Sequence, residues 1–322
     1  MPKLKIELNP VAKSYQNSAF PFSVMQACDP DTVYFAINNF TQLRFLAESP
    51  TQFNFYYTWF NSWKCIDVQN VLRNDYMTLW NLSIVSCIKQ AIDKEIYVRA
   101  IVNEYYVPHR KVYQREYNEH DILIYGYEEN LFNVLGYDDT GHYSATIITI
   151  DEFLNAYESV KSLQFTVFFT AANYYRCKFD YDLNLRLIGD YIRSKNTTFI
   201  HPFYTESHGK SVLGVDAVVK MLEYSRRNFM NRERLDIRFF DCYLEHKRLM
   251  KMRIRLLSDI LNTPELCDEY EGVFNQASII KNLSIKTDIT RKNSDFDNLE
   301  KLVLENLTME KKVLCKLLDY TS

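Results

Sequence analysis

The chain has 322 residues, enough to bury a full hydrophobic core in one elaborated domain or two modest ones. Its formal net charge of −3 gives no general attraction to nucleic acid or to an anionic membrane, so we expect neither as a partner. No window approaches about 18 uncharged apolar residues, and the first residues show no secretory signal, so the sequence predicts a cytoplasmic protein.

The first half of the chain predicts both helices and strands. Asp29 or Asp31 is placed to cap a helix that begins near Pro30 and carries one apolar stripe, made of Val33, Ile37, Phe40 and Leu43. A second helix is expected over residues 76–94. Apolar runs then predict strands at 98–102, 122–125, 132–135 and 165–169, with a capped helix at 151–160 before the last of them.

From about residue 171 onward the pattern becomes helical. Apolar residues at helical spacing predict helices over 212–229 and 235–261. A polar stretch, 281–298, precedes a last helix, for which Ser294 and Asp297 form a weak capping box. The sequence therefore predicts two regions, 1–170 and 171–322.

The seven cysteines are scattered, odd in number and free of C-x-x-C spacing. This pattern is unlike a disulfide framework or a zinc site, and it predicts reduced thiols of which at most one is catalytic. Neither of the common glycine-rich nucleotide motifs occurs, so we expect no bound nucleotide and no metal.

Cys28 is the cysteine that the sequence favours as a nucleophile. A nucleophilic thiol needs a base that takes its proton and a third group that orients the base. The unpaired N–H groups at a helix N-terminus also lower a thiol's pKa. Cys28 alone precedes a predicted helix start, although a cysteine is more often a small buried hydrophobic residue.

Three further residues complete the candidate site. His120 precedes a predicted strand and is the candidate base, whereas an isolated histidine is usually structural. Asp138 is the candidate orienting acid, and its alternative role is that of a turn residue in Y-D-D-T-G. Gln26 is a candidate oxyanion-hole donor together with the backbone N–H of Cys28.

A basic run follows Glu245 and contains no acid before Asp259. Its functional interpretation is a landing surface for an acidic partner, and its alternative is a solvated helix face with stems packed on the core. The candidate docking residues are Lys247, Arg248, Lys251 and Arg255.

Several stretches resemble the butirosin-acyltransferase-like family, which is related to the papain-fold leader peptidases of bacteriocin export. The resemblance is carried by HDILIYGYEENLFNVLGYDDTGHYSATIITIDEFLNAY (120–157), NEYYVP (103–108), SVLGVDAVVKMLEY and LDIRFFDCYLEHKRLM. It implies an α+β, papain-like cysteine protease fold with a helix bearing Cys28, an antiparallel sheet bearing His120 and a helical C-terminal extension. The chain departs from the family pattern at Asp29-Pro30 and at Gly136, where related peptidases often have Asp.

The resemblance also implies a function in specialised-metabolite (antibiotic) biosynthesis. An acyl group would move from the phosphopantetheine thioester of an acyl or peptidyl carrier protein to Cys28, and then to a small amine, with no bound cofactor. A closthioamide-type pathway is compatible with this chemistry. The alternatives are a papain-like cysteine peptidase or thioesterase, which uses water as the acceptor, and a catalytically inactive papain-fold binding protein.

Overall fold

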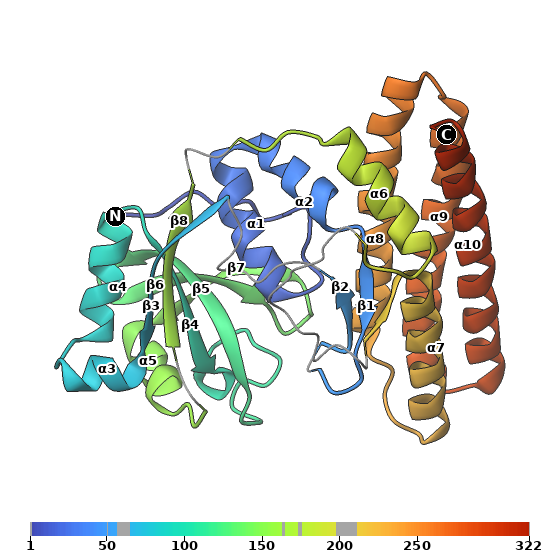
Figure 1. Cartoon of the computed structure of the whole chain (residues 1–322). Coiled ribbons are helices and arrows are strands. Elements are labelled where there is room, and N and C mark those ends of the chain that lie inside the picture. Colours follow the sequence, from blue (N-terminus) through green and yellow to red (C-terminus); the bar gives the residue numbers. More distant parts are fainter. Residues whose placement is uncertain are drawn as a thin grey trace. The chain divides into compact units, whose positions relative to one another are not determined.

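The computed structural model describes residues 2–49, 51–56, 65–162, 165–172, 176–197 and 211–321 (Figure 1). The chain is α+β and divides into two units. Unit 1 contains Met1–Val33 and Thr58–Cys177, and unit 2 contains Tyr34–Tyr57 and Lys178–Ser322.

Unit 1 is built on an antiparallel sheet. In the described part of this unit, six strands pair in the order β3-β8-β4-β5-β6-β7. All the pairings are antiparallel, and each of the predicted strands lies within one of these elements. The strands are β3 (Ile66–Arg73), β4 (Tyr97–Asn103), β5 (Glu119–Glu128), β6 (Leu131–Tyr137), β7 (Tyr143–Thr149) and β8 (Phe165–Ala171).

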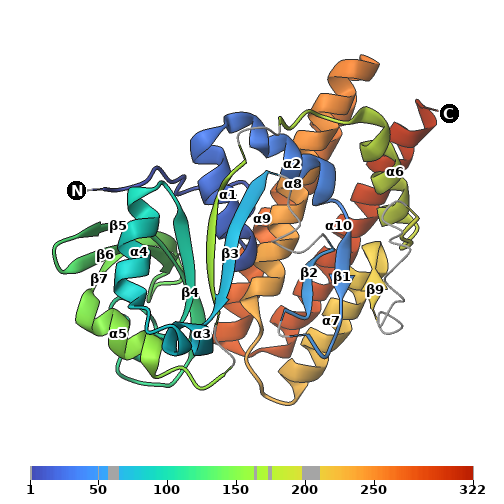
Figure 2. The same ribbon diagram turned by 60° about the vertical axis from the view of Figure 1, so that its left-hand side comes forward.

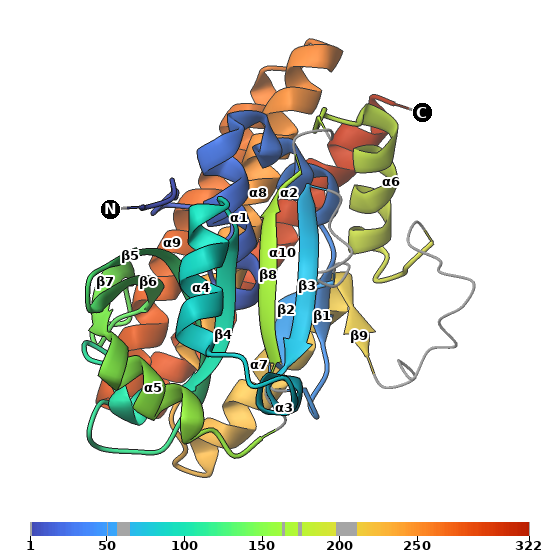
Figure 3. The same ribbon diagram turned by 90° about the vertical axis from the view of Figure 1, so that its left-hand side faces the viewer.

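The helices of unit 1 lie on both faces of this sheet. They are α1 (Gln16–Cys28), η1 (Pro30–Thr32), α3 (Asn74–Leu79), α4 (Ile84–Asp93), η3 (Glu104–Tyr106) and α5 (Ile150–Glu158). In Figure 1, α4 and α5 lie to the left of the strands and α1 to the right, and Figure 3 shows α4 and α5 on the near side. We call the α4–α5 side the first face and the α1 side the second face.

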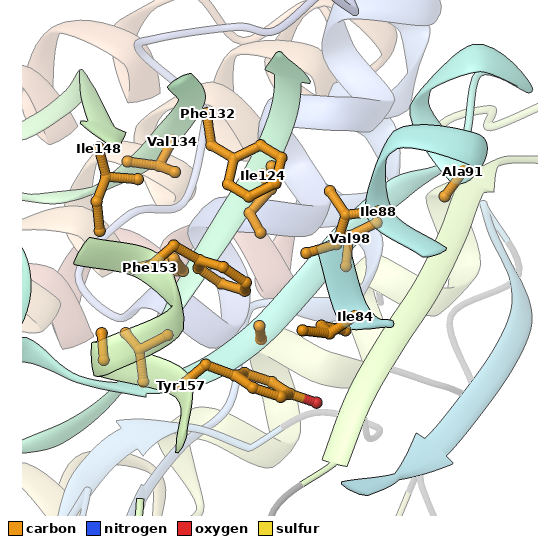
Figure 4. Packing of buried hydrophobic residues seen from close by; sticks show 14 of the residues in the cluster. Ile84, Ile88, Ala91, Val98, Ile124, Phe132, Val134, Ile148, Phe153 and Tyr157 are labelled. Atoms are coloured by element: carbon orange, nitrogen blue, oxygen red, sulfur yellow. The ribbon is translucent and has the colours of Figure 1, made fainter. Parts of the chain in front are cut away.

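Side chains alternate between the two faces along each strand because the pleat has a period of two residues. On the first face, Val98, Ile124 and Phe132 pack with Ile88 of α4 and Phe153 of α5 in a buried apolar cluster (Figure 4). On the second face, Tyr143 contacts Phe20 of α1, with ring centroids 6.1 Å apart, and shares a 2.9 Å hydrogen bond with Ser23.

Local sequence signals explain several element boundaries. α5 begins with a capping box in which Thr149 and Glu152 bond each other's backbone N–H groups, which confirms the helix predicted there. The helix predicted over 76–94 is instead divided into α3 and α4, since Asn81 adopts a left-handed conformation (φ 50°) and Ser83 starts a new helix as its N-cap.

Unit 2 combines a small sheet with long helices. β1 (Leu43–Phe45) pairs with both β2 (Phe53–Phe55) and β9 (Val212–Leu213), and α7 packs beside this sheet (Figure 2). The helices are α2 (Val33–Asn39), α6 (Tyr181–Ile192), α7 (Gly214–Met230), α8 (Ile237–Leu261), α9 (Glu265–Thr290) and α10 (Asn293–Asp319).

The predicted helices over 212–229 and 235–261 correspond to α7 and α8. The prediction of a polar connection over 281–298 is wrong, because α9 continues to Thr290 and α10 starts at Asn293. The predicted capping box is absent as well, since Lys292 is the N-cap of α10 and makes no side-chain cap.

The domain prediction needs one correction, because Tyr34–Tyr57 belongs to the second unit. The cause is hydrogen bonding to buried backbone groups. His246 and Arg253 of α8 bind the carbonyl oxygens of Thr41 and Ile37, and a buried carbonyl needs such a partner. The boundary near 170 corresponds to Cys177–Lys178 in the structure.

A buried carboxylate connects four helices of unit 2. Glu310 of α10 accepts hydrogen bonds from Lys247 of α8 (2.6 Å), Tyr191 of α6 (2.8 Å) and Tyr270 of α9 (2.5 Å). Glu310 is 1% exposed and Lys247 0%. Burial lowers the pKa of Lys247 and the neighbouring carboxylate opposes this change, so the ion pair is stable only while both partners are present.

In the described ranges, no helix is long and apolar enough to span a bilayer.

We expect Glu310→Gln to lower the free energy of unfolding of unit 2 by about 3–5 kcal/mol, since it leaves the buried Lys247 ammonium without its counter-charge. Urea denaturation measures this loss. Glu305→Gln, on the exposed surface of the same helix, is the matched control and should cost under about 1 kcal/mol. Adding Lys247→Met to Glu310→Gln should recover part of the loss. Equal costs for the two single variants would contradict the central role of the buried pair.

Candidate functional site

Cys28 lies between two helical segments. It is the last residue of α1, which the sequence did not predict. The helix predicted to begin near Pro30 follows it as η1 and α2, with Asp29 as the N-cap. Burial of the thiol raises the pKa of Cys28; Lys5 opposes this change, and Glu95 and Asp29 add to it. The C-terminal end of a helix is also its negative end, which disfavours a thiolate.

His120 lies on the first face of the sheet. It stands opposite Val102 in the β4–β5 ladder, and directly opposed residues point to the same face. Val102 and Ile122, which share this face, belong to the apolar cluster under α4 and α5. His120 itself is exposed, and its Nδ1 accepts a 2.9 Å hydrogen bond from the backbone N–H of Asp121.

Cys28 lies near the other end of β4 and on the second face. Its thiol interacts electrostatically with Tyr97, the first residue of β4. Tyr97 and Val102 are separated by roughly 17 Å along the strand, at about 3.4 Å per residue. Odd and even positions of β4 point to opposite faces, so Tyr97 and His120 lie on different sides of the sheet. The structure therefore does not bring Cys28 and His120 together.

Asp138 is a turn residue. It follows β6 in the hairpin to β7, and one of its carboxylate oxygens accepts hydrogen bonds from the backbone N–H groups of Thr140 (3.0 Å) and His142 (2.9 Å). The other oxygen accepts from Ser144. Burial alone would raise the pKa of Asp138, but these hydrogen bonds hold it below its usual value. The turn interpretation accounts for this residue.

Gln26 also has a structural partner. Its side-chain oxygen accepts a 2.7 Å hydrogen bond from the backbone N–H of Val11, which ties the N-terminal segment to α1. Gln26 lies in the last turn of α1, where helix geometry directs backbone N–H groups away from a reacting group at Cys28.

The other end of α1 faces a buried arginine that sequence reasoning missed. Arg110 is 3% exposed, and its Nη1 donates a 2.7 Å hydrogen bond to the carbonyl of Tyr137. Its Nε lies 3.8 Å from Glu104, and neither Nε nor Nη2 has a hydrogen-bond partner among the described residues. Burial lowers the pKa of Arg110, and Glu104, Asp138 and Tyr143 oppose this change.

Gly136 explains how Arg110 fits. A Cβ at this position would lie 2.6 Å from Arg110 Nη2 and 3.0 Å from Nε2 of Gln16, the first residue of α1. Any larger residue would displace the guanidinium. Gly136 therefore makes room for the guanidinium of Arg110.

A cleft of about 400 Å³ opens in unit 1. Its lining includes residues that point to the second face from β5, β6 and β7, together with Lys3 from the N-terminal segment. The lining residues are Lys3, His109, Tyr125, Asn133, Ala145, Thr146 and Ile147. They offer an ammonium, an imidazole, a phenol and an amide, which is a set suited to hold a small polar or anionic ligand.

Two features shape this cleft. Lys3 forms a β-bridge with Gly126, where a Cβ would lie 3.1 Å from the Lys3 Cα, so the close approach favours glycine. The Lys3 ammonium lies 5.5 Å from the centre of the Tyr125 ring. Only folding brings Lys3 to the cleft, because more than 100 residues separate it from Tyr125.

The predicted docking run is divided between core and surface. Lys247 is fully buried against Glu310, so its assignment to a docking surface is wrong. Its neighbours His246 and Arg253 are also buried, because α8 packs against other elements on more than one side. Lys251 pairs with Glu271 at 2.5 Å, Arg248 lies 3.8 Å from Glu245, and Arg255 is exposed.

A comparison with protein-family models finds no match, and a comparison with curated proteins finds none either. The resemblance to the butirosin-acyltransferase-like family therefore stays a prediction.

The pH dependence of Cys28 alkylation tests the separation of Cys28 from His120. We expect the midpoint for reaction with iodoacetamide, followed by peptide mass spectrometry, to lie above that of an ordinary thiol. Glu95→Gln should lower the midpoint by removing a negative charge, and Lys5→Gln should raise it. His120→Ala should leave it unchanged. A rise on removing His120 would mean that an imidazolium stabilises the thiolate and would contradict the separation.

Proposed function

We propose that this chain is a ligand-binding protein that uses a papain-like α+β unit as a scaffold and does not transfer acyl groups through Cys28. The observation that carries the proposal is the placement of Cys28 and His120 at different ends of β4 and on different faces of the sheet. Proton transfer from a thiol to an imidazole requires hydrogen-bond reach, directly or through one water.

The local chemistry of each predicted residue supports the same proposal. The thiol of Cys28 has a raised pKa, and the oxygens of Asp138 are used by a turn. The N-terminal end of α1, which would favour a thiolate, is at Gln16, and the buried Arg110 lies beside it. The helix start after Cys28 is capped by the carboxylate of Asp29. Neither amide nor guanidinium is a nucleophile at neutral pH.

The cleft on the second face is the proposed ligand site. Lys3 supplies a positive charge for a phosphate or carboxylate, and Asn133 and Tyr125 supply hydrogen-bonding groups for amides. A phosphopantetheine arm has this combination of a phosphate and two amides, and it is the carrier group that the family resemblance implies. We propose it as the ligand class.

The acyltransferase hypothesis is the second candidate. Two observations favour it. Cys28 is exposed at the surface, and the positive charge of Lys5 lowers the pKa of its thiol, although partial burial, Glu95 and Asp29 raise it. A thioester could exchange onto an exposed thiol, but without a base the exchange would be slow and independent of His120.

Intact-protein mass spectrometry after mixing with an acylated carrier protein distinguishes the two candidates. We expect no acyl adduct beyond slow chemical background, and the same background from the His120→Ala protein. Cys28→Ala should remove only this background. Rapid loading that both substitutions abolish would support the acyltransferase and overturn the binding proposal. Rapid thioester hydrolysis that both substitutions abolish would support the thioesterase alternative.

Calorimetric titration tests the cleft with 4′-phosphopantetheine and, as its uncharged counterpart, pantetheine. We expect phosphopantetheine to bind more tightly, and Lys3→Gln to weaken it roughly fivefold to tenfold by removing a charge-assisted contact. Lys5→Gln, two residues along the same segment and outside the cleft lining, is the matched control and should change little. Absence of binding would refute this ligand class. Equal losses of affinity in the two variants would mean that the ligand is attracted by the general positive charge of the segment and not held by Lys3 in the cleft.

A further inference from the structure

Two buried thiols of unit 1 lie next to each other. The sulfur atoms of Cys65 and Cys177 are 2.8 Å apart, although 112 residues separate them in the sequence. Neither forms a disulfide bond in the structure, and they are 2% and 5% exposed. A disulfide bond requires about 2.05 Å between sulfurs, so a small movement would suffice to join them.

The backbone holds one of these thiols firmly. Cys65 immediately precedes β3, the edge strand of the sheet, and its carbonyl accepts a 2.9 Å hydrogen bond from the N–H of Ala172. This bond extends the β3–β8 ladder by one residue beyond the pair formed by Ile66 and Ala171. Cys177 is the last residue of unit 1 before the chain enters unit 2.

We propose that Cys65 and Cys177 are a redox-active pair that forms an intramolecular disulfide with a low-molecular-weight disulfide as oxidant. One cysteine thiolate attacks the oxidant and releases one thiol, forming a mixed disulfide. The second cysteine then attacks the protein sulfur of that mixed disulfide and releases the second thiol. The two protein thiols lose two protons and two electrons, and the oxidant's S–S bond is reduced to two thiols.

The native fold should favour this disulfide strongly. Closing a loop of this length in the unfolded chain carries a large entropic cost, whereas the folded chain already holds the sulfurs together. The hydrogen bond to Cys177 and burial raise the pKa of the Cys65 thiol, so we expect oxidation to proceed slowly through transient opening. The equilibrium constant for forming the disulfide does not depend on how fast the thiols become accessible.

The experiment measures the equilibrium in glutathione buffers of graded redox ratio. The exposed cysteines are first removed with Cys28→Ser and Cys315→Ser, which prevents links between molecules. After equilibration, acid quenching and alkylation, mass spectrometry quantifies the peptides that carry a Cys65–Cys177 cross-link. We expect the equilibrium constant for oxidation to be at least roughly 100-fold larger for the native protein than for the chain in denaturing urea.

The oxidised protein should also melt roughly 5 °C or more above the reduced protein. Cys177→Ser should lose both the cross-link and the melting shift, whereas Cys87→Ser, the matched control in α4, should keep both. A native oxidation constant equal to or below that of the unfolded chain would overturn the proposal, and so would native protein that carries only mixed disulfides with glutathione at Cys65 or Cys177.

Discussion

The two-residue alternation of the unit 1 sheet is the constraint on which the candidate site depends. Adjacent residues of a strand point to opposite faces, so the register of β4 against β5 determines what each side chain can reach. Even positions such as Val102 and Ile122 form the core under α4 and α5, and His120 shares their face. Odd positions, from Tyr97 onward, face α1 and Cys28. The same register that buries the apolar core therefore separates the two residues that a cysteine enzyme would need to bring together.

Each unit also has a buried charge that the hydrophobic pattern does not explain. Glu310 connects four helices through Lys247 and two tyrosines, and the ion pair is enclosed on all sides. Arg110 lies between the end of β6, Glu104 and the start of α1. A buried charge is stable only when its partners surround it in one particular arrangement. Both groups therefore favour the native packing over other packings that would bury a similar amount of apolar surface. Neither belongs to the cleft, and we assign both a structural role.

These features favour recognition over covalent chemistry in unit 1. A catalytic thiol benefits from a positive environment, whereas at Cys28 burial raises the pKa and the charge of Lys5 is opposed by two carboxylates and by the C-terminal end of α1. The cleft beside Lys3 needs no activated group, only charge and hydrogen-bonding atoms on a rigid sheet. The Cys65–Cys177 pair lies at the edge strand, so its oxidation would brace the sheet without entering the ligand site.

The sequence by itself determined the α+β class, most strands of the first unit and the helices α5, α7 and α8, because alternation, capping residues and helical spacing are local signals. It missed α1, whose apolar residues surround the helix instead of following one stripe and which contains Pro21. The helix predicted to start near Pro30 is present as η1 and α2, but without α1 the sequence did not show that Cys28 also ends a helix. Only the tertiary structure decided the burial of Lys247, the pairing of Lys3 with Gly126 and the approach of Cys65 to Cys177. Each of these depends on contacts between residues far apart in the chain, and local patterns carry no information about such contacts.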